Sequence, residues 1–459
     1  MASISSPGIG SGLDVNTIVS QLMKLEQRPL DLLQTKASGI ETKISSFGQI
    51  KSAMSALYDA AKGLADLDSW RGRLLNSSDE SILKGSATGE ATAAQFSVQV
   101  NALAQAQAVA SGSVASGASI GTSGTLSIQR GSWSEDSSSF TDAGASVNIA
   151  IDANDSLATI AGKINKADAG ISAVVVKGAT GDQLLLRSSK TGEENGFALS
   201  VSDPGLSKLA YDPASVAAND GATRTQAAQD ALFTINGIAS KSASNTVTDV
   251  VPGLTLNLVK TSPTPVDVSI TEDTKAIKTK IEAFVQAYNK VNSVVADLTR
   301  YNQATSTSQP LQGDSTAVAL QNSLRRIIGT PNAEGAYLSD LGLQLQRDGS
   351  LSMNATKIDA ALTDLPKLQK LLTDGTNGFV TQIRDFAFKA NGVDGSITSR
   401  NNALQASLKS NHSDQDRMSL LLEQRQKSLL KQYQSLDASM GSMGSLGSFV
   451  SQWSNSLKS

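Results

Sequence analysis

Hydrophobic residues recur at heptad spacing near both ends of the chain. Their steps of three, four or seven residues are typical of the seam of a coiled coil. The spacing therefore predicts a helix at each end that packs beside another helix. The seam positions are Val15, Ile18, Leu22 and Leu25 before Pro29, and Leu429, Tyr433, Leu436, Met440, Met443, Val450, Trp453 and Leu457 at the C-terminal end.

Two longer apolar seams lie further inside the chain. A seam of leucine, isoleucine and aromatic residues is most often the core of an ordinary helical bundle. We expect these two helices to pack together within one chain, along with part of the C-terminal helix. Their seam positions are Ile40, Ile44, Phe47 and Met54 in the first, and Ile277, Ile281, Phe284, Tyr288, Val291, Val295 and Leu298 in the second.

The middle of the chain has a different pattern. From about residue 70 to residue 273 the hydrophobic period is two, and glycine, serine and threonine are dense, which predicts β-structure. The spacing of Leu157, Ile160 and Ile164 predicts one helix against a sheet. The nine predicted strands are residues 96–100, 125–128, 147–151, 171–176, 183–188, 198–201, 232–235, 254–259 and 266–270.

Two features of the C-terminal seam weaken the predicted helix. Gly441, Gly444 and Gly447 each cost about 1 kcal/mol relative to alanine, so we expect this segment to fray in the free monomer and to fold once packed. The polar residues 410–416 are expected to interrupt the helix further upstream. The Gly-rich residues 1–13 are likewise expected to be flexible until bound.

The reactive side chains of the chain are few. There is no cysteine and only one histidine, His412, which excludes thiol catalysis, disulfides and thiolate zinc sites. No phosphate-binding or hydrolase motif is present, so we expect no enzyme, no catalytic residues, no cofactor and no metal site. A net charge of −3 without a basic stripe argues against nucleic acid, and no apolar run is long enough to insert into a membrane.

Several motifs resemble one known family. The opening stretch from Gly8-Ile9-Gly10-Ser11-Gly12-Leu13-Asp14 to Gln21-Leu22-Met23 closely resembles the start of the flagellar filament cap proteins, or hook-associated protein 2 family. Residues 148–201, which include Ile164-Asn165, resemble the flagellin hook IN motif. Asp348-Gly349-Ser350-Leu351 and Lys431-Gln432-Tyr433 resemble the family's bundle hairpin and terminal helix.

The resemblance implies an elongated α+β protein with four parts. Residues 1–37 and 411–459 would form a conditional coiled-coil domain, and residues 38–70 and 274–410 a helical bundle that forms a leg. Residues 71–118 and 225–273 would form a proximal β head domain, and residues 119–224 a distal β head domain with the IN motif, one inserted in the other.

The resemblance also implies a function. The protein would cap the distal end of the flagellar filament, where it helps exported flagellin to fold and insert and prevents its loss. It would leave the cell through the flagellar type III channel without a Sec signal and act extracellularly, as a small ring of about five copies. Its partners would be flagellin, the hook–filament junction protein and an export chaperone on the C-terminal helix. The alternatives are another axial flagellar component and an adhesin whose distal head binds mucin or a host glycan.

Overall fold

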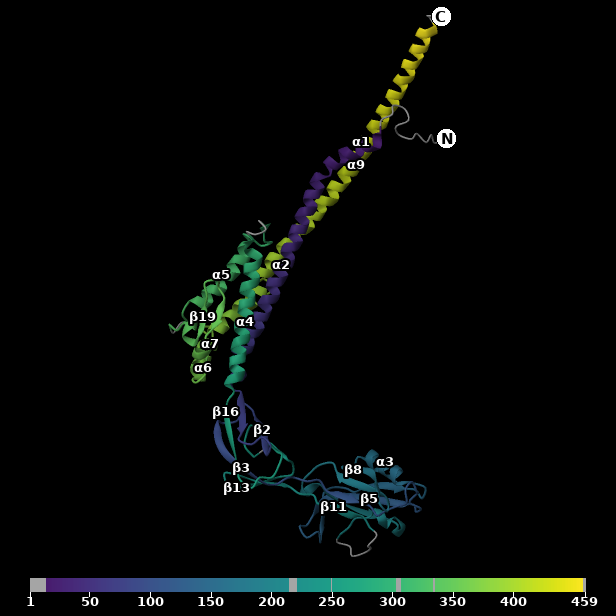
Figure 1. Cartoon of the computed structure of the whole chain (residues 1–459), viewed down its shortest axis with the longest axis vertical. Coiled ribbons are helices and arrows are strands. Elements are labelled where there is room, and N and C mark those ends of the chain that lie inside the picture. Colours follow the sequence, from purple (N-terminus) through teal and green to yellow (C-terminus); the bar gives the residue numbers. More distant parts are fainter. Residues whose placement is uncertain (1–13, 214–220, 249, 303–306, 333–334, 457–459) are drawn as a thin grey trace. The chain divides into compact units, whose positions relative to one another are not determined.

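The structure is a computed structural model, and it describes residues 14–213, 221–248, 250–302, 307–332 and 335–456. The chain divides into two compact units. The first comprises Met1–Ser69 and Ile277–Ser459, and the second comprises Trp70–Ala276. Helices dominate the first unit and strands the second, so the mixed α and β architecture predicted from the change of hydrophobic period is confirmed (Figure 1).

The first unit is built on long helices (Figure 1). α1 and α2 are separated at Gln27, and Pro29 lies in the first turn of α2, where its missing amide hydrogen is not needed. Its helices are α1 (Val15–Glu26), α2 (Arg28–Ala65), α4 (Thr274–Thr299), α5 (Ser315–Gly329), α6 (Ala355–Ala361), α7 (Leu365–Thr373), α8 (Phe379–Asn391) and α9 (Ser396–Ser456), with the short turns η1 (Leu67–Trp70) and η4 (Leu338–Leu341) and the strand pairs β17 (Tyr301–Asn302) with β18 (Thr307–Ser308) and β19 (Leu343–Leu345) with β20 (Leu351–Met353).

The predicted interruption of the C-terminal helix at residues 410–416 is wrong. α9 is continuous: Asn411 and Gln415 lie on the side that packs against α2, and Ser410, His412, Ser413 and Asp416 are exposed to solvent, where polar residues do not disturb a helix. Asn411 is buried and accepts a hydrogen bond from Gln415 Nε2 at 2.6 Å, and the same nitrogen lies 3.5 Å from the Leu33 carbonyl oxygen. Polar residues inside a helical pair can fix its register without ending the helix.

The predicted hairpin around Asp348 and Gly349 is confirmed as β19 and β20. Side-chain amides hold it against α4. Asn289 donates to the Leu351 carbonyl at 2.9 Å and accepts from the Leu351 amide at 2.7 Å, while Asn292 donates to the Asp348 carbonyl at 3.1 Å. Gly349 supplies the positive φ, +84°, that the turn requires.

The second unit contains an eight-stranded antiparallel sheet, in the order β13-β12-β3-β16-β1-β2-β15-β14. Alternate residues point into one apolar core, which is why the strands have period two. On β15 the buried residues are Leu254, Leu256 and Leu258. The strands are β1 (Arg73–Ser77), β2 (Leu83–Ala87), β3 (Ala94–Ala102), β12 (Ala231–Ile235), β13 (Ile238–Ser242), β14 (Thr246–Val247), β15 (Leu254–Leu258) and β16 (Val266–Glu272).

A second core in the same unit lies between two smaller sheets. One has the order β10-β5-β6 with β7 beside β5, and the other has the order β11-β4-β9-β8. Helix α3 (Leu157–Ala167) packs on β8 and buries Leu157, Ile160 and Ile164 in this core. The remaining elements are β4 (Ala108–Ala110), β5 (Gly124–Trp133), β6 (Phe140–Asp142), β7 (Val147–Ile151), β8 (Ile171–Gly178), β9 (Gly181–Ser188), η2 (Glu193–Asn195), β10 (Gly196–Val201), η3 (Pro204–Leu209) and β11 (Thr223–Gln226).

All nine predicted strands and the predicted helix α3 are present. The sequence patterns missed strands β1, β2, β4, β6, β11, β13, β14, β17 and β18, and also helices α7 and α8. β1, β2 and β13 have two hydrophobic residues in five, against three or four in the predicted strands β7, β12 and β15 of the same length, and the other missed strands are only two to four residues long, so no period of two stands out. The missed helices contain the buried residues Leu368 and Leu372 in α7 and Phe379 and Ile383 in α8.

Candidate functional site

Helix α1 lies beside the middle of α9 (Figure 1). Val15, Val19 and Met23 form one buried stripe of α1, four residues apart, and they pack against Leu422 of α9. Leu30, Met418, Leu429, Leu430 and Tyr433 line the margin of this cluster. The apolar cluster therefore fixes α1 to the middle of α9.

The start of α1 is well defined by its cap. The Asp14 carboxylate accepts hydrogen bonds from the Thr17 hydroxyl and the Thr17 amide, the latter at 3.0 Å. Both bonds favour the ionised form, so they hold the pKa of Asp14 below its usual range. The capped helix begins at Val15, the first residue of the buried stripe.

The predicted seam residues of α1 lie at different depths. Val15 is buried, Ile18 and Leu22 are half-buried, and Leu25 is exposed. Val19 and Met23, which the sequence reasoning did not select, are buried. The two apolar stripes are neighbours on one helix, and only the position of α9 determines which of them is covered.

The predicted seam residues of α9 change from packed to exposed along the helix. Leu429 and Tyr433 are half-buried beside α1. From Leu436 onward the large side chains are exposed, and Leu457 lies outside the described residues. The exposed residues are Leu436, Met440, Met443, Val450 and Trp453 from the prediction, and Leu446 and Phe449 in addition.

These exposed side chains form a surface that we call the α9 stripe: Leu436, Met440, Met443, Leu446, Val450 and Trp453. At 100° per residue they cover one broad side of the helix. Met443 is 73% exposed, Leu446 65% and Val450 53%. An apolar strip of this width on a helix is a surface that packs against another helix when one is available.

The backbone beneath the α9 stripe is helical through Gly441, Gly444 and Gly447. Serine hydroxyls bond to this backbone at every third residue. Ser442, Ser445 and Ser448 each donate to the carbonyl three residues earlier, at 2.7 to 2.8 Å. These bonds run along the helix itself, so they leave the apolar side chains available to a partner.

The predicted bundle seam lies in the interior of the first unit. Ile44 and Leu298 are half-buried, and the other nine positions are buried: Ile40, Phe47, Met54, Ile277, Ile281, Phe284, Tyr288, Val291 and Val295. Burial raises the pKa of the Tyr288 phenol to about 12, because the interior disfavours its charged form. The predicted seam is thus the core of the helical unit in which α9 begins.

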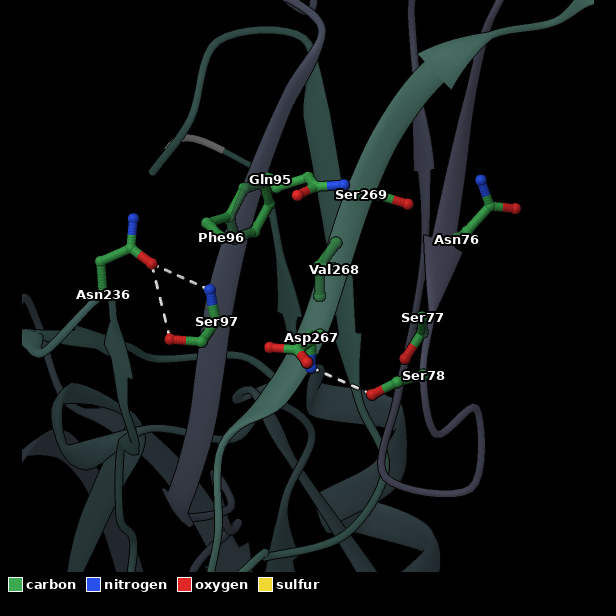
Figure 2. A pocket seen from close by; sticks show the side chains of 10 residues that line it. All are labelled: Asn76, Ser77, Ser78, Gln95, Phe96, Ser97, Asn236, Asp267, Val268 and Ser269. Atoms are coloured by element: carbon green, nitrogen blue, oxygen red, sulfur yellow. Dashed lines mark hydrogen bonds between the residues drawn. The ribbon is translucent and has the colours of Figure 1, made fainter.

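A hollow on the eight-stranded sheet, about 600 Å³, is shown in Figure 2. Its polar atoms largely bond to the sheet itself: Asn236 Oδ1 accepts from the Ser97 amide at 2.9 Å, and Ser78 Oγ accepts from the Asp267 amide at 3.0 Å. Asp267 is the single ionisable residue among those that line it. One carboxylate without a second acid, base or nucleophile does not form a catalytic site.

No group of three or more His, Cys, Asp or Glu side chains in the described ranges is arranged to hold a metal ion. Within the same ranges, no helix is both long enough and apolar enough to cross a membrane. The α1–α9 pair with the α9 stripe is therefore the candidate functional site.

Family models match most of the chain. The model for the N-terminus of flagellar hook-associated protein 2 matches residues 11–107, and the model for its C-terminus matches residues 228–445. The flagellin hook IN motif matches residues 138–190. The matches cover both ends of the chain and the region of α3, β8 and β9.

Individual relatives and a solved structure agree with these models. A-type flagellar hook-associated protein 2 of Pseudomonas aeruginosa is 30% identical over 98% of this chain and 97% of its own length. Flagellar hook-associated protein 2 of Escherichia coli (strain K12) is 30% identical over 98% of each chain. The crystal structure of the flagellar cap protein FliD D1-D2-D3 domains from Escherichia coli has a TM-score of 0.62 at 30% identity, and it covers 78% of this chain and 99% of that one. The chain therefore belongs to the flagellar hook-associated protein 2 family, the flagellar cap proteins.

Proposed function

We propose that this protein caps the distal, extracellular end of a flagellar filament, where it promotes the insertion of flagellin and prevents its loss. The observation that carries the proposal is the exposed α9 stripe, which continues from a packed α1–α9 pair. Apolar helices exposed at the end of a filament would be a matching partner, because an apolar helix face packs against another apolar helix. The relatives named above are described as hook-associated or cap proteins, which favours capping over the adhesin alternative.

The size of the α9 stripe suits a hold that can be released. Burial of Met443, Leu446 and Val450 is worth roughly 5–9 kcal/mol at about 1.5–3 kcal/mol per side chain. The three glycines of the same segment cost about 3 kcal/mol relative to alanine. Before the cost of association, a surplus of only a few kcal/mol per copy remains, so a single end helix binds weakly and can leave as each flagellin enters.

The finer parts of the proposal concern partners and assembly. The cap acts as a ring of about five copies, which needs two different surfaces on each copy that meet head to tail. It follows the hook–filament junction protein onto the growing structure and then contacts flagellin. Before export through the type III channel, a chaperone covers the α9 stripe, because so large an apolar surface favours aggregation.

The four-part division is also proposed. Residues 1–37 and 411–459 attach to the filament, residues 38–70 and 274–410 form the leg, and residues 71–118 with 225–273 and 119–224 form the proximal and distal head. Separate apolar cores within the second unit support two head parts. Strand β4 at residues 108–110, inside the range proposed for the proximal head, pairs with β9 and β11 and places Val109 in the second core, so this strand packs with the distal head.

A deletion strain tests the proposal. Cells without this protein are expected to shed flagellin monomers and to carry no full-length filaments, and the wild-type chain is expected to restore them. A chain with Met443→Asp and Val450→Asp is expected to fail, since each carboxylate would have to be buried against the filament. Ser448→Asp, on the other side of the same helix, is the matched control and is expected to restore growth. Full filaments without shed flagellin in the deletion strain would reject the capping function.

A further inference from the structure

The side chain of Asn165 forms two hydrogen bonds with the backbone of a single residue on β8. Asn165 lies in the last turn of α3, within the stretch matched by the IN motif. Its Nδ2 donates to the Ala173 carbonyl at 2.8 Å, and its Oδ1 accepts from the Ala173 amide at 2.8 Å. A carboxamide offers one donor and one acceptor side by side, as a peptide group of a neighbouring strand does.

These bonds close the open edge of a sheet. β8 is the last strand in the order β11-β4-β9-β8, so one of its sides has no neighbouring strand. The Gly170 carbonyl accepts a hydrogen bond from the Ser189 amide, which follows β9. The backbone amides and carbonyls of the even-numbered residues of β8 therefore point toward β9, and those of the odd-numbered residues point to the open edge. The backbone amide and carbonyl of Ala173 therefore point to the open edge, and the Asn165 side chain bonds to them where a neighbouring strand would.

The same arrangement recurs at three other places among the residues that the structure describes. Gln107 forms both bonds with Phe197 of β10, at 2.7 and 3.0 Å, and Asn289 forms both with Leu351 of β20. Asn245 forms both with Ala104, at 2.7 and 3.0 Å. Gln107 is fully buried and Asn245 and Asn289 are partly buried, whereas Asn165 is exposed and protects an edge that faces solvent.

The strand beside Asn165 is prone to pairing. Val174 is 55% exposed and Val176 is 45% exposed, on the face of β8 opposite α3. Exposed valines on an open edge strand are the features that lead to edge-to-edge pairing between chains. A second β8 could pair antiparallel about Val175, which would place the Val174 of each copy opposite the Val176 of the other.

We propose that Asn165 blocks the edge of β8 against pairing with the β8 of a second copy of this chain. Such pairing would need the outward amide and carbonyl of Ala173, which the Asn165 carboxamide occupies. A β8–β8 pair is two-fold symmetric and joins heads in twos, and if the proposed function is right it would compete with the head-to-tail contacts of a ring. Asn165 is thus a positioning residue that keeps the heads available for the correct assembly.

The test uses the full-length chain with Asn165→Ala, and Lys166→Ala as the control on the next exposed position of α3. Hydrogen exchange at the Ala173 amide is expected to accelerate about three- to tenfold in Asn165→Ala, because one hydrogen bond is lost. Sedimentation is expected to reveal a new, concentration-dependent association that Lys166→Ala does not show. Asn165→Asp keeps the acceptor but places a carboxylate oxygen against the Ala173 carbonyl, so it is a second way to open this contact if the alanine variant folds poorly.

Two further variants distinguish this association from any other. The chain has no cysteine, so an equimolar mixture of Val174→Cys chains and Val176→Cys chains reports contact between two copies at β8, because these positions lie opposite each other in the pair and can form a disulfide-linked dimer. That dimer is expected with Asn165→Ala and not with Asn165 intact. Val174→Lys with Val176→Lys is expected to abolish the new association by charge repulsion. Faster exchange at Ala173 without association, or association that the lysines do not reverse, would overturn the proposal. Neither result depends on filament capping, which the deletion strain tests separately.

Discussion

Replacement of Asp314 by alanine is expected to destabilise the first unit by about 2–4 kcal/mol. Asp314 connects α5 with the base of α9. Its Oδ1 accepts from the Thr316 and Ala317 amides at 3.0 and 3.4 Å and caps α5, while its Oδ2 accepts from Arg400 Nε at 3.1 Å and Nη2 at 2.8 Å. These bonds hold the first turns of α9 against the start of α5.

The magnitude follows from these two groups of bonds. Loss of an N-cap costs about 1 kcal/mol. Removal of one partner from a fully buried ion pair costs about 3–5 kcal/mol, but the Arg400 side chain is 37% exposed and can turn to water, so we assign about 1–3 kcal/mol to this part. Asp314→Asn keeps the capping oxygen and loses the charge, so it is expected to cost less than Asp314→Ala.

Urea unfolding, with hydrogen exchange in α5 as the local readout, measures these costs. Arg400→Met and the double variant complete a cycle whose coupling free energy is expected to be about 1–2 kcal/mol. The reasoning would be refuted if Asp314→Ala lowered the free energy of unfolding by less than about 0.5 kcal/mol, or if the α5 amides kept their wild-type protection from hydrogen exchange. Loss of a buried cap and of an ion pair cannot both leave stability unchanged.

Three other substitutions test separate parts of the fold. Tyr288→Phe should preserve stability or raise it by up to about 1 kcal/mol, since no partner for this buried hydroxyl is found in the described part of the chain. The pKa of Tyr288 is about 12 in the folded protein against an ordinary 10.0, so wild-type stability should fall as the pH rises above 10. Denaturant midpoints measured from about pH 8 to 12 would check whether the variant lacks that fall. Hydrogen bonds from the Asp152 amide and from Lys163 hold the pKa of Asp155 below its usual range, so the head should lose stability as the pH falls below about 4, and Asp155→Asn should reduce that acid dependence in circular dichroism melts. Gly349→Ala should destabilise the first unit by about 1–3 kcal/mol in thermal melts, because its φ is +84° and a Cβ would overlap a guanidinium of α5.

The helical ends of the chain illustrate what a sequence pattern can determine. Heptad spacing predicted helices at both termini, but it could not choose between two neighbouring stripes of α1. Val19 and Met23 are the residues that α9 covers, and Leu25 is exposed. The polar residues Asn411 and Gln415 resembled a break until their contacts with each other and with α2 were known.

The paired hydrogen bonds between an Asn or Gln side chain and the backbone of one residue, which we call carboxamide clamps, could not be predicted from the sequence for a physical reason. Asn245 and Ala104 are 141 positions apart, and neither residue type signals an edge strand. Even Asn165, only eight positions from Ala173, stands out in the sequence only by resemblance to a motif. Periodicity reports which side of an element is apolar, whereas a clamp depends on where two elements meet.

The most direct test of the central claim is to observe the protein on filament ends. A single cysteine introduced in the second unit of this cysteine-free chain allows a gold label, and electron microscopy then gives the fraction of distal ends that carry it. The wild-type chain and Ser448→Asp are expected to label the distal ends alone, and Met443→Asp with Val450→Asp to leave them bare. Equal labelling by the double variant, or label along the filament sides, would contradict attachment through the α9 stripe.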